Sequence, residues 1–147
     1  MTNGDCIFCK ILAGESEVSF VYRVETCAAF MDTQPINPGH LLVVPIRHAA
    51  DLSELRDEEG AQLFRIAQRL AAALRRSGVK CEGINLFLAD GEAAMQEVFH
   101  IHLHVLPRFG GDGFGLKLPK KYFKKPKRAE LNEVAEKIKR ELPSTHD

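Results

Sequence analysis

The chain has 147 residues, of which 45% are hydrophobic and 27% are charged. These values are typical of a globular protein and exclude collagen-like, fibrous and disordered classes. No apolar run approaches the roughly 20 residues that span a bilayer, and the first residues lack the basic and apolar stretches of a signal peptide. We therefore expect one domain over residues 1–147, a cytoplasmic location, no membrane partner and reduced cysteines.

The formal net charge is zero, but the charge is unevenly distributed along the chain. Residues 117–140 contain ten Lys or Arg and three Glu, which gives this segment a net charge of +7. Such a segment can attract phosphates or nucleic acid, or it can be a solubilising helix with a lysine-rich lead-in. Only Tyr122 and Phe123 are interleaved with the charge, so a base-stacking surface is not indicated. We favour the solubilising helix and expect no nucleic-acid partner.

Short apolar segments alternate with two helical patterns. Strands are expected at 19–23, 26–31, 40–46, 83–89 and 99–108. Leu and Ile residues recur at mainly three- and four-residue spacings over 52–76, which predicts a long helix that ends at Ser77 and Gly78. Pro126 suits the first turn of a second helix that ends near Leu142. Because several strands follow one another directly, we predict an α+β fold with helices packed on an antiparallel sheet.

Three histidines, His100, His102 and His104, stand at alternating positions in the first part of the last expected strand. In a strand their side chains share one face, while Ile101 and Leu103 enter the core. The outer pair then lies roughly 13 Å apart, at about 3.3 Å per residue, so one ion cannot bind all three. Three interpretations remain: a metal held by two of the histidines, a nucleophilic histidine supported by its neighbours, or a polar sheet face.

Cys6 and Cys9 form a C-x-x-C pair, which is the spacing of half a zinc site. No second C-x-x-C exists, so histidines would have to complete such a site. The pair could instead be a redox centre or two unrelated thiols, although no thioredoxin-like βαβ pattern surrounds it. The two other cysteines, Cys27 and Cys81, lie among apolar residues and are expected in the core.

Residues 100–106 have the order His-φ-His-φ-His-φ-φ, in which φ stands for a hydrophobic residue. This order resembles the signature of the histidine triad (HIT) family. Residues 37–45, His48 and residues 6–11 resemble further blocks of bacterial Hint-like and Fhit-like members, and Asp90-Gly91-Glu92 with Gln96 resembles the loop before the triad. The resemblance covers about residues 5–115. It implies a HIT-like fold, with a five-stranded antiparallel sheet, a long helix and a C-terminal helix, usually as a homodimer. Residues 116–147 are then a basic linker and the C-terminal helix.

The resemblance also implies a function. Such proteins are nucleotide hydrolases or transferases that cleave the α-phosphorus bond of nucleoside phosphoramidates or dinucleoside polyphosphates through a nucleotidyl-histidine intermediate. By this similarity the catalytic residues are the nucleophile His102, its hydrogen-bonding neighbours His104 and His40, and Gln96 near the phosphate or leaving group. The residues that bind a purine nucleotide are Asp32 at the ribose hydroxyls and Ile7, Phe8 and Phe30 around the base.

In zinc-carrying relatives the metal ligands match Cys6, Cys9, His48 and His100, a closed set that indicates a structural Zn²⁺. From the sequence alone, Asp32 can equally be a turn cap.

The loop before the triad departs from the family pattern at three positions. Ala89 stands where an Asn or Gln is usual, Met95 where a Gly is usual, and Glu97 where a small hydroxyl residue is usual. These changes favour an alternative function, a nucleotide-binding interaction protein with weak or vestigial catalysis. The intact triad and Gln96 oppose that alternative. A third hypothesis, a metal-storage or redox module, predicts several metal ions per chain.

Overall fold

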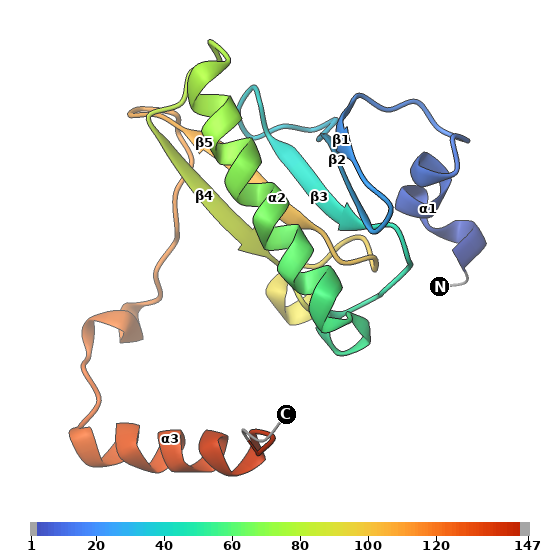
Figure 1. The fold of residues 1–147 in the computed structure, drawn as a ribbon. Helices are drawn as coiled ribbons and strands as arrows, with labels where there is room; N and C mark the ends of the chain where they lie inside the picture. The colour runs from blue at the N-terminus through green and yellow to red at the C-terminus, as the bar shows by residue number, and fades with distance from the viewer. Residues whose placement is uncertain (1–2, 145–147) are drawn as a thin grey trace. The chain divides into compact units, whose positions relative to one another are not determined.

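The computed structural model describes residues 3–144, and the chain divides into two compact units, Met1–Phe114 and Gly115–Asp147. The first unit contains a five-stranded antiparallel sheet with the strand order β1-β2-β3-β5-β4 (Figure 1). Its strands are β1 Phe20–Arg23, β2 Cys27–Met31, β3 Leu41–Pro45, β4 Gly83–Leu88 and β5 Leu103–Arg108. The predicted α+β fold with a five-stranded antiparallel sheet is confirmed.

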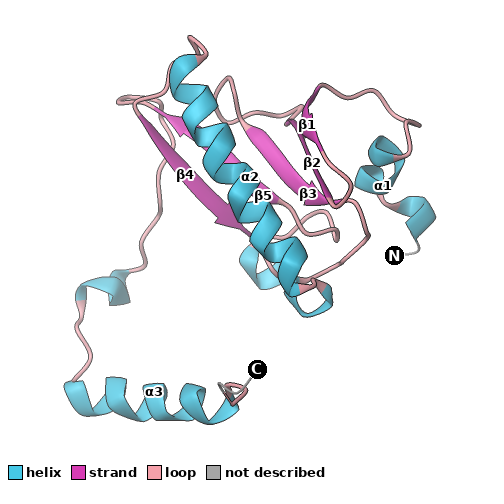
Figure 2. Cartoon of the chain, viewed as in Figure 1, coloured by secondary structure: helices cyan, strands magenta, loops and turns pink. Residues whose placement is uncertain are grey.

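The long helix α2, Asp57–Arg76, lies across one face of the sheet (Figures 1 and 2). Its Leu63, Ile66, Leu70 and Leu74 pack on residues of β2, β3 and β5, because these positions share one side of the helix. The helix begins five residues later than predicted. Residues 52–54 form a separate 3₁₀ turn, which Asp51 caps by accepting from the backbone N–H groups of Ser53 and Glu54.

The opposite face of the sheet is covered by a short helix, α1, which spans Ile7–Leu12. This helix was not predicted, because six residues are too few for a clear periodicity. Its Phe8 and Ile11 pack with Phe30 and Leu42 from the two neighbouring central strands. The sheet is therefore buried on both faces in its centre, which explains why β2 and β3 are almost continuously apolar.

Strand β5 begins at Leu103 instead of Phe99, so only the last histidine of the triad lies within a strand. The register pairs Leu103 with Val43, and continuing it would place Ile101 opposite Pro45. Proline has no backbone N–H to donate to a ladder. The backbone N–H of Ile101 donates instead to the carbonyl of Ala49, at 2.8 Å. The triad therefore enters the sheet from an extended segment that makes irregular hydrogen bonds.

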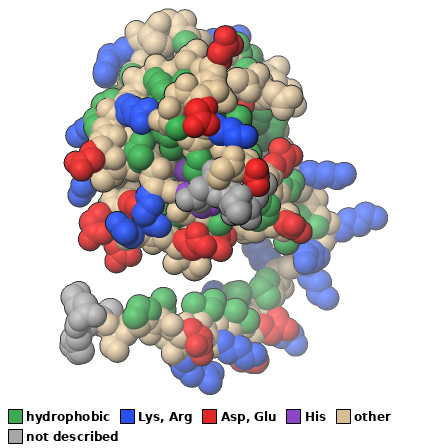
Figure 3. Space-filling model, turned by 90° about the vertical axis from the view of Figure 1, so that its right-hand side faces the viewer, with side chains coloured by type: hydrophobic (Ala, Val, Ile, Leu, Met, Phe, Trp, Pro, Cys, Tyr) green, Lys and Arg blue, Asp and Glu red, His purple; other side chains and the backbone are tan. Residues whose placement is uncertain are grey.

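The second unit contains the helix α3, Arg128–Glu141, close to the predicted 126–142. Every described residue of this unit, 115–144, is exposed. Figure 3 shows hydrophobic side chains along one side of α3 and charged side chains along another. Salt bridges join Lys137 to Glu133 and Lys139 to Glu136 along the helix surface. Within residues 3–144, no helix has the length and apolar character that crossing a membrane requires.

Candidate active site

The ring of His102 lies on the α1 face of the sheet and is 7% exposed. Its Nδ1 is 2.8 Å from the backbone carbonyl oxygen of His100. A carbonyl can only accept, so Nδ1 carries the proton and Nε2 keeps an unshared electron pair. The edge of the ring packs against Phe8, with ring centroids 5.1 Å apart. Local hydrogen bonding therefore fixes both the orientation of His102 and the nitrogen that keeps a free electron pair.

A second set of hydrogen bonds runs from the backbone through His40 to His104. The backbone N–H of Ile36 donates to Nδ1 of His40 at 3.2 Å. Nε2 of His40 must then carry the proton, and it donates to Nδ1 of His104 at 2.9 Å. His104 is left with its proton on Nε2. Its ring centroid lies 4.9 Å from that of His102, so the two imidazoles are neighbours.

Phe87 of β4 stacks on the ring of His104, with centroids 4.1 Å apart and an interplanar angle of 16°. Sequence reasoning did not identify this residue. The register of the sheet would have identified it, because Phe87 lies directly opposite His104 on the neighbouring strand. Stacking limits rotation of the imidazole and thereby holds its hydrogen-bonding direction.

Burial lowers the pKa of each histidine in this group, because the charged imidazolium is poorly solvated there. The pKa of His104 falls to about 4, since burial adds to repulsion from His102 and His40. The carboxylate of Asp32 opposes the shift at all three rings. The three imidazoles are therefore neutral at pH 7, as the tautomers described above require.

Asp32 occupies the turn after β2. Its Oδ1 accepts a hydrogen bond from the backbone N–H of Gln34 at 2.8 Å, and its Oδ2 lies 3.7 Å from Nε2 of His40. Potential ligand atoms of Asp32, His40 and His104 all lie within 4.8 Å of one another. The 2.9 Å between the two histidine nitrogens is a hydrogen-bond length. Two nitrogens on one zinc ion would be about 3.4 Å apart, so hydrogen bonding accounts for this group better than a metal.

Cys6, Cys9, His48 and His100 form a separate cluster in which one ligand atom of each lies within 4.8 Å of the others. The Nδ1 atom of His100 is 3.5 Å from Sγ of Cys6 and 3.6 Å from Sγ of Cys9. Nδ1 of His48 is 3.4 Å from Sγ of Cys9. A tetrahedral ion with Zn–N bonds of about 2.1 Å and Zn–S bonds of about 2.3 Å requires N–S edges of about 3.6 Å. The cluster therefore has the dimensions of a Cys₂His₂ zinc site.

The protonation state of His100 also fits a metal ligand. Its Nε2 is 2.9 Å from the carbonyl oxygen of Pro45, so Nε2 carries the proton and Nδ1 is free to bind a cation. Burial and the neighbouring Cys6 raise the pKa of Cys9 to about 11, so a thiolate there needs a compensating positive charge. His100 joins the two clusters, because its ring faces the cysteines while its carbonyl accepts from His102.

The family model that matches this chain is the HIT domain, over residues 13–111. The chain belongs to the HIT family. The crystal structure of a HIT family member from Bacillus subtilis aligns with a TM-score of 0.87 and 36% identity, over 96% of this chain and 99% of that one.

Two further crystal structures bear on the clusters described above. A Zn-bound histidine triad family protein from Mycobacterium smegmatis has a TM-score of 0.74 and 35% identity, over 95% of this chain and 99% of that one. A histidine triad nucleotide-binding protein from Candida albicans has a TM-score of 0.81 and 28% identity, over 93% and 96% of the two chains.

In this HIT protein the residues expected around the base differ in exposure. Phe8 and Phe30 are buried and contact each other edge-to-face at 5.5 Å, whereas Ile7 is 44% exposed. Phe20, which sequence reasoning did not single out, is partly exposed and packs edge-on against Phe30. The aromatic core thus extends to the surface through Phe20, next to the strand that carries Phe30.

Gln96 is buried, and backbone groups engage its side-chain amide at both ends. Its Oε1 accepts from the N–H of Gly91 at 2.8 Å, and its Nε2 donates to the carbonyls of Ala50 and Val98. These bonds close the loop before the triad and fasten it to the segment after β3. The direct interaction of Gln96 with a phosphate stays a prediction, and its observed role is to hold the loop.

Among residues 3–144, Met95 alone of the non-glycine residues has a positive backbone dihedral angle φ. Its φ is 66° and its ψ is 31°. This is the left-handed conformation, which glycine adopts without steric cost. The Met95 side chain is 84% exposed, so packing of this side chain does not offset the conformational strain. The departure from glycine that the sequence indicated here therefore has a backbone consequence.

We expect Met95→Gly to raise the free energy of unfolding by up to about 1 kcal/mol. The left-handed conformation costs an L-residue about 1–2 kcal/mol, of which the added freedom of glycine in the unfolded chain offsets roughly half. Urea denaturation measures the difference, with Met95→Ala as the control that removes the same side chain but keeps the strain. Equal stability of the glycine and alanine variants would show that Met95 is not strained.

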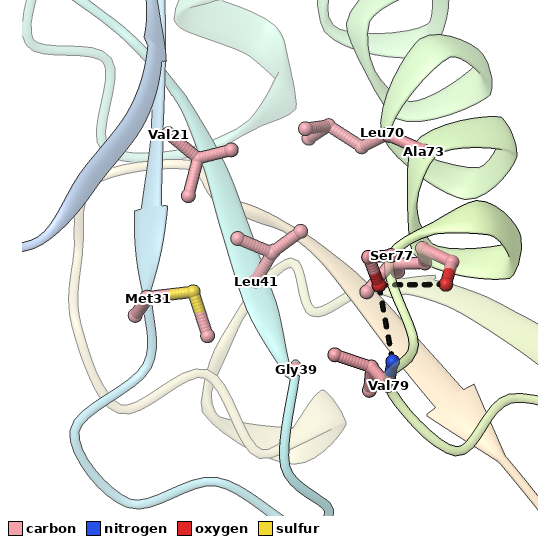
Figure 4. Close-up of a pocket in the computed structure, with 9 residues that line it drawn as sticks. Val21, Met31, Gly39, Leu41, Leu70, Ala73, Ser77 and Val79 are labelled. Atoms are coloured by element: carbon pink, nitrogen blue, oxygen red, sulfur yellow. Dashed lines mark hydrogen bonds between the residues drawn. The ribbon is translucent and has the colours of Figure 1, made fainter.

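The apolar cavity in Figure 4 lies on the other face of the sheet, between α2 and strands β1–β3. Its volume is about 170 Å³, and its walls include Met31, Leu41 and Leu70. Because Leu41 packs with α2, the neighbouring His40 and Leu42 point to the α1 face. The cavity is thus separated from the histidines by the sheet, and the hydroxyl of Ser77 on its wall donates to the backbone carbonyl of Leu74.

Proposed function

We propose that this HIT protein is a nucleotide hydrolase or transferase that cleaves the α-phosphorus bond through a nucleotidyl-His102 intermediate. The observation that carries the proposal is the hydrogen bond from Nδ1 of His102 to the carbonyl of His100, at 2.8 Å. It leaves Nε2 as a neutral nucleophile that needs no base to activate it. Substrates that fit are nucleoside phosphoramidates and dinucleoside polyphosphates.

In the proposed first step, Nε2 of His102 forms a bond to the α-phosphorus while the bond from phosphorus to the leaving nitrogen or oxygen breaks. The leaving atom keeps the bonding electrons and takes a proton from solvent water. The imidazole becomes positively charged, and the carbonyl of His100 stabilises the proton on Nδ1. Water, or another acceptor in a transferase reaction, then attacks phosphorus and releases the nucleotidyl group from Nε2.

His104 and His40 stabilise the charge that develops on the phosphate oxygens. Because Nδ1 of His104 is occupied by His40, the proton on Nε2 is the one that His104 can offer to a phosphate oxygen, and its ring lies 4.9 Å from that of His102. A donor fixed before the reaction stabilises an oxyanion without reorganisation. We propose that Gln96 contributes near the phosphate or leaving group by holding the loop before the triad.

The nucleoside is proposed to bind beside α1. Ile7 supplies exposed apolar surface for a purine, with Phe8 and Phe30 behind it. Oδ2 of Asp32 lies 3.7 Å from Nε2 of His40, longer than a hydrogen bond, and a carboxylate can accept from both ribose hydroxyls with charge-assisted strength. The nucleotide-binding relative from Candida albicans supports this class of ligand.

Turnover of an adenosine phosphoramidate and a dinucleoside polyphosphate, measured side by side, tests the proposed reaction. Release of adenosine monophosphate from either compound supports it, and the ratio of kcat/KM values names the preferred leaving group. Nucleotide binding without turnover of either compound would instead support the interaction protein with vestigial catalysis.

We expect kcat/KM to rise with pH and to level off below neutrality. Only neutral His102 can attack, and burial places its pKa below the ordinary value near 6.5. Protonation therefore removes the nucleophile only as the pH falls beneath that value. A pH–rate profile over about pH 4 to 8 measures the effect. A rate that falls as the pH rises through this range would contradict a neutral nucleophile.

Restoring the family residues in the loop before the triad gives a further test of activity. Ala89 leaves the phosphate one hydrogen bond short, and a bond to a charged group contributes roughly 1.5–3 kcal/mol. We expect Ala89→Asn with Met95→Gly to raise kcat/KM on an adenosine phosphoramidate by roughly 10- to 100-fold. A double variant that folds and binds nucleotide but is no faster would show that this loop does not limit the reaction.

We also propose that the protein is a homodimer. Strand β4 is an edge of the sheet, so its outer backbone groups lack a neighbouring strand in the described chain. Leu86 on β4 and Phe64 on α2 are exposed apolar side chains suited to a second copy. Analytical ultracentrifugation tests this, and Phe64→Glu with Leu86→Lys should shift a dimer toward monomer.

A further inference from the structure

The chain after β5 folds back on itself through a partly buried ion pair between Arg108 and Asp112. Nε and Nη2 of Arg108 donate to the two carboxylate oxygens at 2.6 and 2.8 Å. The Asp112 side chain is 3% exposed and also accepts from the backbone N–H groups of Phe109 and Phe114. These donors hold the pKa of Asp112 well below its usual range. The carboxylate is thus charged and held by several donors.

Asn37 connects this ion pair to the segment before β3. Its Nδ2 donates to Asp112 at 2.8 Å and to the backbone carbonyl of Pro107 at 3.0 Å. Asn37 is 4% exposed; its partner Pro107 lies in β5 with His104, and its partner Asp112 follows that strand. Asn37 therefore ties the 36–40 segment to the strand on which His104 is mounted.

The 36–40 segment sets the orientation and tautomer of His40. The carbonyl of Asn37 accepts from the backbone N–H of His40 at 3.1 Å, and the N–H of Ile36 donates to its ring. Gly39 has a φ of +95°, and a Cβ there would lie 2.8 Å from the side chain of Val79. The segment is consequently held from two sides and has little freedom to move while these contacts exist.

We infer that Asn37, held by the Arg108–Asp112 pair, is a positioning residue that fixes the tautomers of His40 and His104. The expected effect of Asn37 on turnover rests on the proposed function. If Asn37 is replaced, the hydrogen bond from the Ile36 N–H to Nδ1 of His40 is no longer held in place. His40 can then carry its proton on either nitrogen, and the proton on Nε2 of His104 is no longer assured.

The test compares Asn37→Ala and Asp112→Asn with the wild-type chain and with Asn85→Ala. Asn85 accepts from Nη1 of Arg108 at 2.7 Å, so its loss perturbs the same arginine without touching Asn37. Ring ¹⁵N chemical shifts of histidine-labelled protein report the tautomers. Affinity for adenosine monophosphate, thermal unfolding, and kcat and KM on an adenosine phosphoramidate complete the measurements.

For both test variants we expect the ring shifts of His40 and His104 to move toward values of mixed tautomers. We expect kcat to fall by roughly 10- to 100-fold, since misplacement by about 1 Å can cost about 100-fold. KM and nucleotide affinity should stay within about two-fold, and Asn85→Ala should resemble the wild type in all respects except a small loss of thermal stability.

Two results would overturn the inference. One is unchanged ring shifts in both variants, with a loss of stability alone. The other is an equal change of the ring shifts in Asn85→Ala. If Asn37→Ala does not fold, the isosteric Asp112→Asn variant decides. The ring shifts do not depend on catalysis, so absence of wild-type turnover would reject the proposed function while the tautomer measurement still tests the positioning role.

Discussion

Replacing His102 with Gly should abolish turnover while nucleotide binding remains measurable. Nε2 of His102 is the proposed attacking atom, and no other imidazole nitrogen in the site is unprotonated and free. Nδ1 of His40 accepts from Ile36, and Nδ1 of His104 accepts from His40. Loss of a catalytic nucleophile can cost about 10⁶-fold in kcat. We expect a decrease of at least about 10⁴-fold on an adenosine phosphoramidate.

The covalent intermediate gives this prediction a second measurement. Wild-type protein quenched during turnover should carry a nucleotidyl group on one histidine, detected as a mass increase that is lost in acid. The variant should show no such increase. His104→Gly is the matched control, because it removes a neighbouring imidazole but leaves Nε2 of His102, and it should be slowed yet still labelled. Wild-type turnover or labelling by His102→Gly would reject His102 as the nucleophile.

The sequence could predict the face that the histidines share but not their protonation. Alternation over residues 100–104 places Ile101 and Leu103 toward α2, as observed. The tautomers depend instead on backbone atoms, namely the carbonyl of His100 and the N–H of Ile36. Backbone groups are common to all residues, so no residue pattern reveals which of them will meet a ring.

Contacts between segments distant in sequence also explain where the predicted elements and the structure differ. The 99–108 strand was predicted too long because Pro45, which interrupts the ladder, belongs to another strand that only the register brings opposite. Gln96 was expected near the phosphate from its position in a motif, which stays a prediction, but the motif did not reveal its three hydrogen bonds to backbone groups. Periodicity was sufficient for α2, since its apolar residues repeat over 20 residues.

The Arg108–Asp112 pair was not predicted at all. Its residues are four apart in a glycine-rich segment, a spacing that indicates a contact only within a helix. Asn37 was noticed as part of a motif but not as a ligand of Asp112, which lies 75 positions away. Long-range polar contacts of this kind carry no periodic signal, and only the folded chain displays them.

We expect one zinc ion per chain and a large loss of stability when its site is broken. We propose that Cys6, Cys9, His48 and His100 hold the ion, since their N–S separations of 3.4–3.6 Å fit a tetrahedral site. Binding of such an ion is coupled to folding. Cys6→Ser should therefore lose the zinc and lower the free energy of unfolding by about 4 kcal/mol or more, as metal loss can.

Cys81→Ser makes the same chemical change at a half-buried thiol outside the cluster, and it should retain zinc and lose little stability. Elemental analysis and thermal unfolding with and without a chelator distinguish the two variants. Because the carbonyl of His100 orients His102, Cys6→Ser should also slow turnover even where it remains folded. Wild-type protein that purifies without metal, and unfolds at the same temperature as Cys6→Ser, would show that the cluster is only two thiols beside two histidines. Several ions per chain would instead support a metal-storage role.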